Sequence, residues 1–156
     1  MRKIFGEFIY EKAKSDDSIV ILIGDTGYGL FDKFKEQFPD RFYNLGLAEQ
    51  SMISIAGGLA LQGMKPWVYA ITPFLIERPY EQIKIDIMMN NANVKLMGYD
   101  DYPTQGLTHQ CNYSKDILEP LGMKCYYPTN ESEMKEYIKE MYENNQPEFM
   151  RMRKLK

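Results

Sequence analysis

Apolar runs alternate with segments of helical periodicity along the chain. Ile4, Phe5, Phe8 and Ile9 recur at helical spacing. After a polar break, the segment 18–23 is a short, almost uninterrupted β-branched run. This pattern predicts a helix followed by a buried strand.

The same alternation continues to the end of the chain. Further strands are predicted at 41–44, 66–71, 94–98, 124–127 and 148–151. Helices are predicted at 50–61, 80–90, near 116–119, and along the apolar stripe of Met134, Tyr137, Ile138, Met141 and Tyr142. The last helix follows Asn130, and Glu133 is placed as its capping-box acid. The segments 24–29, 44–49, 72–78 and 98–109 are left as loops.

Strands that are apolar throughout and alternate with helices are typical of a parallel sheet that is covered on both faces. We therefore predict an α/β fold, a doubly wound and mostly parallel sheet with helices on both faces. Ligands in such folds bind beyond the carboxyl ends of the strands, where the four predicted loops should lie. The length of 156 residues fits a single domain, residues 1–156.

Composition excludes several classes of partner. The formal charge is −3 and there is no run of Lys or Arg, which argues against nucleic acid and anionic membranes. No stretch of about 18 apolar residues occurs and the N-terminus is charged, so we expect a cytoplasmic protein without a membrane span or signal peptide. Two cysteines and one histidine provide neither a disulfide framework nor a zinc site, and no metal ligand is predicted in this chain.

Glu49 is the sole acidic residue between Asn44 and Gly63. It either caps the following helix or is buried for a chemical purpose, because an unpaired buried carboxylate is costly. The helix behind it contains small residues, among them Gly57 and Gly58, which favour a close-packed interface. The glycines of the 24–29 loop fit either a phosphate-binding loop or a plain turn.

Several segments carry a more specific pattern. They are FPDRF at 38–42, NLGLAEQSM at 44–52, AGGLALQG at 56–63, Phe74 with RPYEQI at 78–83, GLTHQ at 106–110 and PEFMR at 147–151. Together, in order and with the spacing kept, they resemble the pyrimidine-binding domain of transketolase-like thiamine diphosphate enzymes. The similarity spans nearly the whole chain.

The resemblance implies a function and a cofactor. We expect the pyrimidine-binding subunit of a split, thiamine diphosphate-dependent transketolase-like enzyme that transfers a two-carbon ketol unit between sugar or sugar phosphate substrates. In this family the residue at the Glu49 position binds the far nitrogen of the aminopyrimidine and is catalytic. Phe74 takes the position of the aromatic residue that stacks on that ring. Asp25 and Thr26 take positions that line the pyrimidine pocket.

The resemblance also implies substrate contacts. His109 is similar to the catalytic histidine that contacts hydroxyl groups near the reactive carbon. Arg78 takes the position of a phosphate or carboxylate clamp, or pairs with Glu77 or Glu81. Gln105 replaces the aspartate with which sugar-using transketolases bind an acceptor hydroxyl, which leaves the acceptor open.

A second subunit is expected because the chain contains no Gly-Asp-Gly segment followed by the required Asn. Pyrophosphate and Mg²⁺ should then be held by a separate pyrophosphate-binding subunit, in a heterotetramer with the small-residue helix at the interface. The chain ends where transketolases continue to a third domain, which should be absent or supplied by another chain. Two alternatives stay open: a beta-type subunit of a two-oxoacid dehydrogenase or carboligating decarboxylase, and a non-catalytic α/β scaffold.

Overall fold

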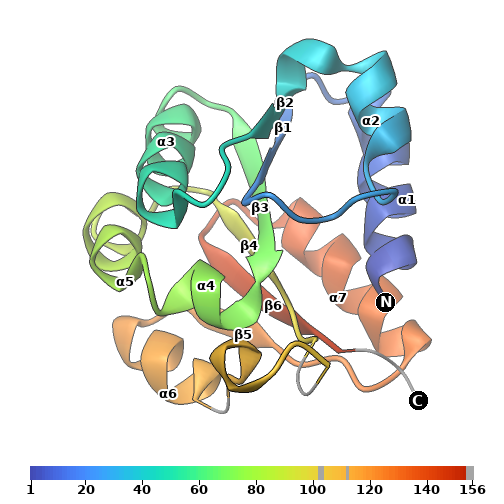
Figure 1. Ribbon diagram of the computed structural model, residues 1–156. Helices are drawn as coiled ribbons and strands as arrows, with labels where there is room; N and C mark the ends of the chain where they lie inside the picture. Colours follow the sequence, from blue (N-terminus) through green and yellow to red (C-terminus); the bar gives the residue numbers. More distant parts are fainter. Residues whose placement is uncertain (102–103, 112, 154–156) are drawn as a thin grey trace.

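The computed structural model describes residues 1–101, 104–111 and 113–153, so residues 102–103 of the predicted 98–109 loop lie outside the described residues. One parallel six-stranded sheet, in the order β2-β1-β3-β4-β6-β5, organises this part of the chain (Figure 1). The strands are β1 (Ile19–Ile23), β2 (Phe42–Asn44), β3 (Lys65–Ile71), β4 (Lys95–Tyr99), β5 (Lys124–Tyr126) and β6 (Glu148–Met152). The predicted parallel sheet is confirmed.

Helices cover both faces of the sheet, as predicted (Figure 1). One face carries α3 (Glu49–Leu61), α4 (Thr72–Ile76), α5 (Tyr80–Gln82) and α6 (Ser114–Leu118), and the other carries α1 (Arg2–Ala13), α2 (Asp32–Gln37) and α7 (Glu131–Glu143). Shorter turns are η1 (Pro39–Arg41), the π-helical η2 (Ile83–Met88), η3 (Leu107–His109) and η4 (Glu119–Leu121). None of the helices in the described ranges is long and apolar enough to cross a membrane.

Two hydrophobic cores lie on the two sides of the sheet because side chains alternate along each strand. In β1, Val20 and Leu22 pack under α3, while Ile19, Ile21 and Ile23 pack under α1. All five are at most 6% exposed. Burial of each such side chain stabilises the fold by about 1.5–3 kcal/mol, so the apolar strands anchor both layers.

The segment 72–78 is not the predicted loop, because α4 begins directly after β3. Pro73 lies in the first turn, where a helix needs no N–H from it. Leu75 and Ile76 are fully buried and hold this single turn on the sheet. The helix is too short to show the apolar periodicity from which longer helices are predicted.

Two other helices also differ from their sequence-based descriptions. The unpredicted α2 has only six residues and one buried side chain, Phe34, so it shows no apolar stripe. The predicted helix 80–90 begins at Tyr80 but widens into the π-helix η2. Its backbone packs tightly on α3: a Cβ on Gly57 would lie 2.9 Å from the carbonyl oxygen of Asp86. The small size of Gly57 therefore serves a contact within the chain, and the subunit interface on this helix stays a prediction.

The final helix, α7, confirms its predicted capping box. Asn130 Oδ1 accepts a hydrogen bond from the Glu133 N–H at 3.0 Å, and Glu133 Oε2 accepts one from the Thr129 N–H at 2.7 Å. The first bond satisfies a backbone donor that helix geometry leaves unpaired in the first turn of α7, and the second ties Glu133 to the residue before the N-cap.

Candidate functional site

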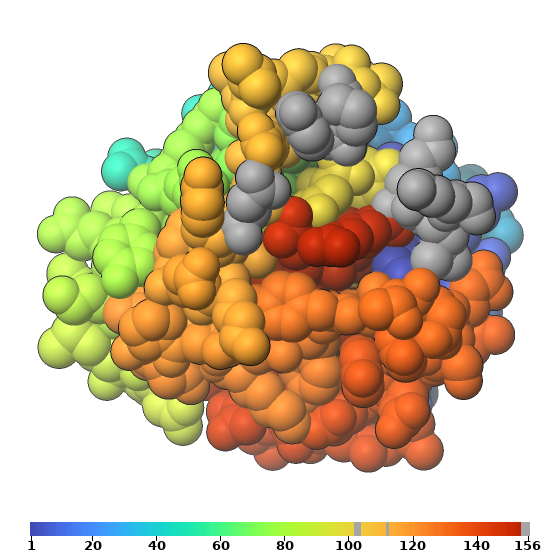
Figure 2. Space-filling view, turned by 90° about the horizontal axis from the view of Figure 1, so that it is seen from below, coloured from blue at the N-terminus to red at the C-terminus, as the bar shows by residue number. Residues whose placement is uncertain are grey.

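The carboxyl ends of β1, β2, β3 and β4 meet at one edge of the parallel sheet, and the predicted site residues follow these strands. Figure 2 views the molecule from below and shows the red segment, which contains β6, at the base of a hollow between yellow and orange segments. We refer to this edge of the sheet as the carboxyl edge. It is where a parallel sheet of this class binds ligands.

Glu49 is the first residue of α3, and its side chain is only 4% exposed. Free N–H groups and the helix dipole favour a carboxylate in this first turn. Arg78 Nη1 lies 2.7 Å from Glu49 Oε1, and the Arg78 side chain is 47% exposed. The predicted pairing of Arg78 with Glu77 or Glu81 is wrong, because Arg78 pairs with Glu49 across 29 residues of sequence.

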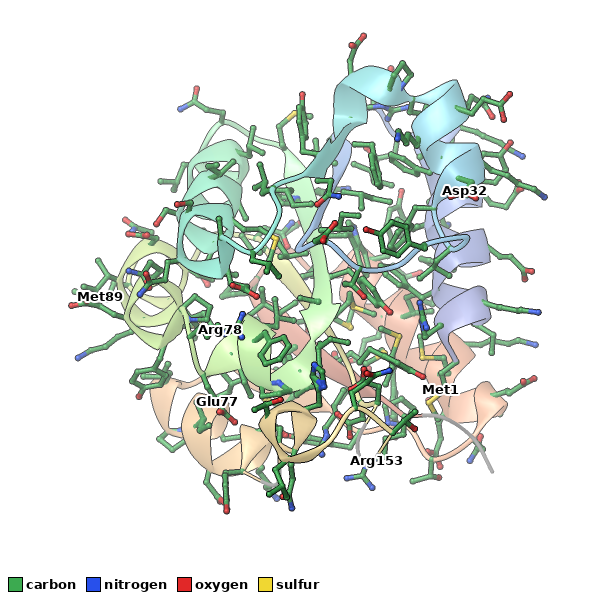
Figure 3. The ribbon with its side chains drawn as sticks, viewed as in Figure 1. Met1, Asp32, Glu77, Arg78, Met89 and Arg153 are labelled. Atoms are coloured by element: carbon green, nitrogen blue, oxygen red, sulfur yellow. The ribbon has the colours of Figure 1, made fainter. Side chains whose placement is uncertain are left out.

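Phe74 lies on α4, between the Glu49–Arg78 ion pair and the loop that carries His109. The guanidinium carbon of Arg78 is 3.8 Å from the centroid of the Phe74 ring, a cation–π contact. The ring centroid of His109 is 4.8 Å from that of Phe74, with the planes tilted by 58°. Figure 3 labels Arg78 just beyond α4, close to the sheet. The structure thus brings together four predicted residues: Glu49, Arg78, Phe74 and His109.

His109 ends η3, which begins after Gly106 at a φ of +85°. Its Nδ1 is 3.3 Å from the carbonyl oxygen of Gln105 and 3.9 Å from Asp101 Oδ1. A carbonyl oxygen accepts but cannot donate, so the first contact is a hydrogen bond when Nδ1 carries the proton. Nε2 then has a lone pair for a ligand. The Gln105 side chain is exposed, and its backbone orients the imidazole.

A buried polar network beneath these residues was not predicted. Arg151 Nε donates to Asp100 Oδ2 at 2.7 Å, and Thr72 Oγ1 donates to Asp100 Oδ1 at 2.8 Å. The Arg151 guanidinium also donates to the carbonyl oxygen of Cys111 and lies 3.4 Å from Ser114 Oγ. The network joins the start of α4 to the loop that precedes α6. An arginine directly after the apolar residues Phe149 and Met150 of a predicted strand was the sequence signal for it.

Asp25 and Thr26 lie at the carboxyl edge but apart from the cluster. Asp25 has a φ of +47°, and its N–H donates to Asn44 Oδ1 at 3.1 Å. Hydrogen bonds from the Tyr28 hydroxyl and the Asn44 amide lower the pKa of Asp25. Within the described residues, neither Asp25 nor Thr26 has a hydrogen bond to Glu49. The contacts of Asp25 instead tie the first loop to the segment before α3.

An open pocket of about 620 Å³ lies beside the ion pair. Its lining consists of Leu47, Ala48, Glu49, Gln50, Ser51 and Arg78. The site therefore presents a buried carboxylate with one side-chain donor among the residues that the structure describes, next to space for a ligand. In the part of the chain that the structure describes, no three His, Cys, Asp or Glu side chains lie close enough to hold a metal ion.

The whole sequence matches one family model, the pyrimidine binding domain of transketolase, over residues 1–156. The chain belongs to this transketolase family. The resemblance found in the sequence is confirmed, and thiamine diphosphate is the cofactor that this family implies.

Curated relatives support the same family. One of the subunits of the apulose-4-phosphate transketolase of Actinobacillus succinogenes is 33% identical over 135 residues, which are 84% of this chain and 43% of that protein. A 1-deoxy-D-xylulose-5-phosphate synthase of Clostridium perfringens is 36% identical over 126 residues, 75% of this chain and 19% of the synthase. The chain thus spans less than half the length of these transketolase-family relatives.

Solved structures confirm the fold. A split-gene transketolase described as an inactive beta4 tetramer has a TM-score of 0.85 and 25% identity, and the match covers 97% of this chain and 50% of that one. The transketolase of Campylobacter jejuni has a TM-score of 0.84 at 16% identity, covering 97% of this chain and 25% of that one. The latter likeness shows the transketolase fold alone.

Proposed function

We propose that this chain is the pyrimidine-binding subunit of a split transketolase-like enzyme. Such an enzyme transfers a two-carbon ketol unit between sugar phosphates, together with a separate subunit that holds pyrophosphate and Mg²⁺. Family membership and the likeness to one subunit of a two-part transketolase support this proposal. The observation that carries it is the buried carboxylate of Glu49, paired with one half-exposed donor beside an aromatic ring.

The residues present fit the aminopyrimidine of thiamine diphosphate. Glu49 accepts a hydrogen bond from a planar cation, and that same cation lies against the Phe74 ring. An aminopyrimidine with a proton on its ring nitrogen is also planar, cationic and an N–H donor, so it can satisfy both residues. When bound, thiamine diphosphate supplies an acidic thiazolium carbon that acts as the nucleophile.

Glu49 would act by holding a proton at the far ring nitrogen. A carboxylate that is 4% exposed is screened little by water, which strengthens a charge-assisted hydrogen bond. Phe74 would orient the ring by stacking on it, and α4 is held in place by fully buried side chains. We assign Asp25 and Thr26 to the pocket wall on the side of the first loop.

His109 would bind substrate. Its Nδ1 proton is directed to the Gln105 carbonyl oxygen, which leaves Nε2 to accept a hydrogen bond from a substrate hydroxyl group. We propose that the Gln105 amide, which is exposed next to it, contacts the acceptor. Arg78 would contact a substrate phosphate or carboxylate when it is not paired with Glu49.

Exposed apolar side chains support a partner subunit. Leu47 and Leu107 are 76% and 78% exposed at the carboxyl edge, and Met89 at the end of η2 is 75% exposed (Figure 3). Ile55 on α3 and Ile85 on η2 add to this surface. We propose that the partner covers it in a complex of two subunits of each kind. Obligate interfaces of this kind bury more than roughly 2,000 Å².

Glu49→Gln tests the function. In the complex with the pyrophosphate-binding partner we expect kcat for ketol transfer to fall by about 10³-fold, roughly 4 kcal/mol. The amide keeps the shape of the side chain but loses its charge, so folding and association should persist. Glu77→Gln, an exposed neighbour of the cluster, is the matched control. Near wild-type turnover in Glu49→Gln would show that the assigned role is wrong.

A synthase of a phosphorylated deoxyketose is the second candidate. Proteins named 1-deoxy-D-xylulose-5-phosphate synthase are as similar to this chain as the apulose-4-phosphate transketolase subunit is. Product analysis of the complex with ketose and oxoacid donors separates the two candidates. A non-catalytic scaffold is disfavoured because it would have no reason to bring Glu49, Phe74 and His109 together.

A further inference from the structure

The geometry points to a second role for Arg78: it is a placeholder for the aminopyrimidine ring. We infer that its guanidinium group occupies the ring's place on Glu49 and Phe74, and that it leaves when the ring binds. This inference rests on the proposed function. It adds that the Arg78 guanidinium must leave Glu49 and Phe74 each time the aminopyrimidine ring binds.

The two contacts of Arg78 are the two that the ring requires. Its Nη1 is 2.7 Å from Glu49 Oε1, and its guanidinium carbon is 3.8 Å from the Phe74 ring centroid. The second distance is a van der Waals separation, so no other group fits between the guanidinium and the ring. The guanidinium and the ring therefore exclude each other from this face of Phe74.

The difference in burial decides which partner moves. Glu49 is 4% exposed and cannot lose its partner without leaving a buried charge unpaired, whereas Arg78 is 47% exposed. A long arginine side chain that is already half in water can move fully into water at small cost. The exchange therefore replaces one planar donor with another, and Glu49 keeps a partner before and after the exchange.

Competition by Arg78 should weaken ring binding. If the guanidinium occupies the site in about 80–90% of molecules, the apparent Kd of the ring rises about five- to tenfold, because ligand binds only the remaining fraction. Removing the guanidinium removes this factor. The direction of the change in Kd distinguishes a placeholder from a residue that helps to bind the cofactor, because loss of a residue that contributes to binding would raise the Kd.

The test is a titration of the isolated, full-length chain with 4-amino-5-hydroxymethyl-2-methylpyrimidine, followed by NMR. We expect Arg78→Ala to bind this probe about five- to tenfold more tightly than wild type. Arg78→Lys keeps the charge without the plane and should bind more tightly by a smaller factor. Lys139→Met removes an exposed cation paired with Glu143 on α7, is the matched control, and should leave the Kd unchanged.

A second signal reports the exchange itself. In the wild-type chain, the Arg78 Nη1 protons should exchange faster with water once the probe is bound, because the guanidinium has left Glu49. Equal or weaker binding by both Arg78 variants, with Glu49→Gln alone losing the probe, would overturn the placeholder while the proposed function stands. Absence of binding in every variant, including wild type, would overturn both.

Discussion

At the amino ends of the strands Lys95 donates to three acceptors. At the carboxyl ends, within residues 1–101, 104–111 and 113–153, Glu49 receives one side-chain hydrogen bond, from a half-exposed arginine. Lys95 Nζ bonds the carbonyl oxygens of Asn144 and Gln146 and the carboxylate of Glu148, and Lys95 and Glu148 are 2% and 0% exposed. Burial lowers the pKa of Lys95, and the hydrogen bond with Glu148 opposes this shift.

The number of hydrogen bonds distinguishes a structural ion pair from a ligand site. Glu148 Oε1 also accepts hydrogen bonds from the Tyr126 hydroxyl at 3.0 Å and the Asn144 amide at 2.8 Å. A ligand therefore has nothing left to satisfy at the Lys95 pair. At the carboxyl edge, Glu49 has unused acceptor capacity and a half-exposed partner next to an open pocket. Burial of charge alone would not separate the two edges, since both carboxylates are buried.

Breaking the Lys95–Glu148 ion pair, whose hydrogen-bonding groups are all satisfied, should have the largest effect on stability. Lys95→Met leaves the Glu148 carboxylate buried without its cation, and we expect the free energy of unfolding to fall by about 3–5 kcal/mol. Urea denaturation followed by circular dichroism measures it. The double variant Lys95→Met/Glu148→Met should lose less than the single one, because no charge stays unpaired. A single variant that loses under about 1 kcal/mol would contradict this account of the edge.

Disrupting the Asp100–Arg151 network beneath the site should lower the free energy of unfolding by a smaller amount, but should also affect function. Asp100→Asn removes the charge that pairs with Arg151, which is 9% exposed. We expect a loss of about 2–3 kcal/mol and a higher KM for the substrate that we propose contacts His109, because the network anchors the His109 loop. The conservative variant Asp100→Glu should recover part of the KM if charge is what matters.

A second cation at the same carboxylate provides the control. Arg153 Nε is 3.6 Å from the same Asp100 oxygen, but its side chain is 63% exposed (Figure 3). Arg153→Met should therefore change stability by less than about 0.5 kcal/mol. Equal effects of Asp100→Asn and Arg153→Met would mean that burial does not set the strength of this network.

The fold could be predicted because its signals are local and repeated. Apolar runs such as 18–23 are long enough to specify buried strands, and the capping box at Asn130 and Glu133 specifies the start of α7. The short helix α4 and the π-helix η2 could not be predicted, because a single turn has no period. The widening of η2 depends on its packing against α3.

The candidate site could be predicted in its members but not in its contacts. Glu49, Phe74 and His109 were recognised from segments that resemble a known family, and the structure brings them together. The pairing of Arg78 with Glu49 joins residues 29 positions apart, and nothing in either local sequence encodes the distance. The same holds for Asp100 and Arg151, which only the order of strands β4 and β6 makes neighbours.

Substitutions at two adjacent glycines of α3 can distinguish packing inside the chain from packing against a partner. A Cβ on Gly57 would lie 2.9 Å from the Asp86 carbonyl oxygen, whereas a Cβ on Gly58 would have no neighbour within 4 Å. Gly57→Ala should therefore cost about 1–2 kcal/mol through overpacking. Gly58→Ala should stabilise the isolated chain by roughly 0.5–1 kcal/mol, because alanine favours a helix.

Thermal denaturation of the isolated chain measures both glycine variants. If the partner covers the exposed face of α3, Gly58→Ala should in addition weaken assembly, seen as a higher dissociation constant in analytical ultracentrifugation with the partner. Destabilisation of the isolated chain by both variants would place the open face of α3 against another part of this chain.

Asp16 lies before β1, at the amino ends of the strands. Burial alone would raise the pKa of its carboxyl group, but hydrogen bonds from Ser18, Lys65 and Tyr142 outweigh it and lower the pKa to about 2. The unfolded chain therefore binds more protons than the folded one between about pH 4 and 2, so stability falls as the pH falls through this window.

Asp16→Asn isolates this contribution. At pH 7 the variant should be less stable than wild type by about 1 kcal/mol, after allowance for partial exposure to solvent. Below about pH 2 the aspartic acid is neutral in both states, and the two proteins should converge. Urea midpoints at steps between pH 7 and 2 measure the difference. If the difference in stability between the two proteins stays constant down to the lowest pH, Asp16 stabilises the amino ends of the strands by its shape and by neutral hydrogen bonds. Its charge would then contribute nothing there, in contrast to the charges of the Lys95–Glu148 pair.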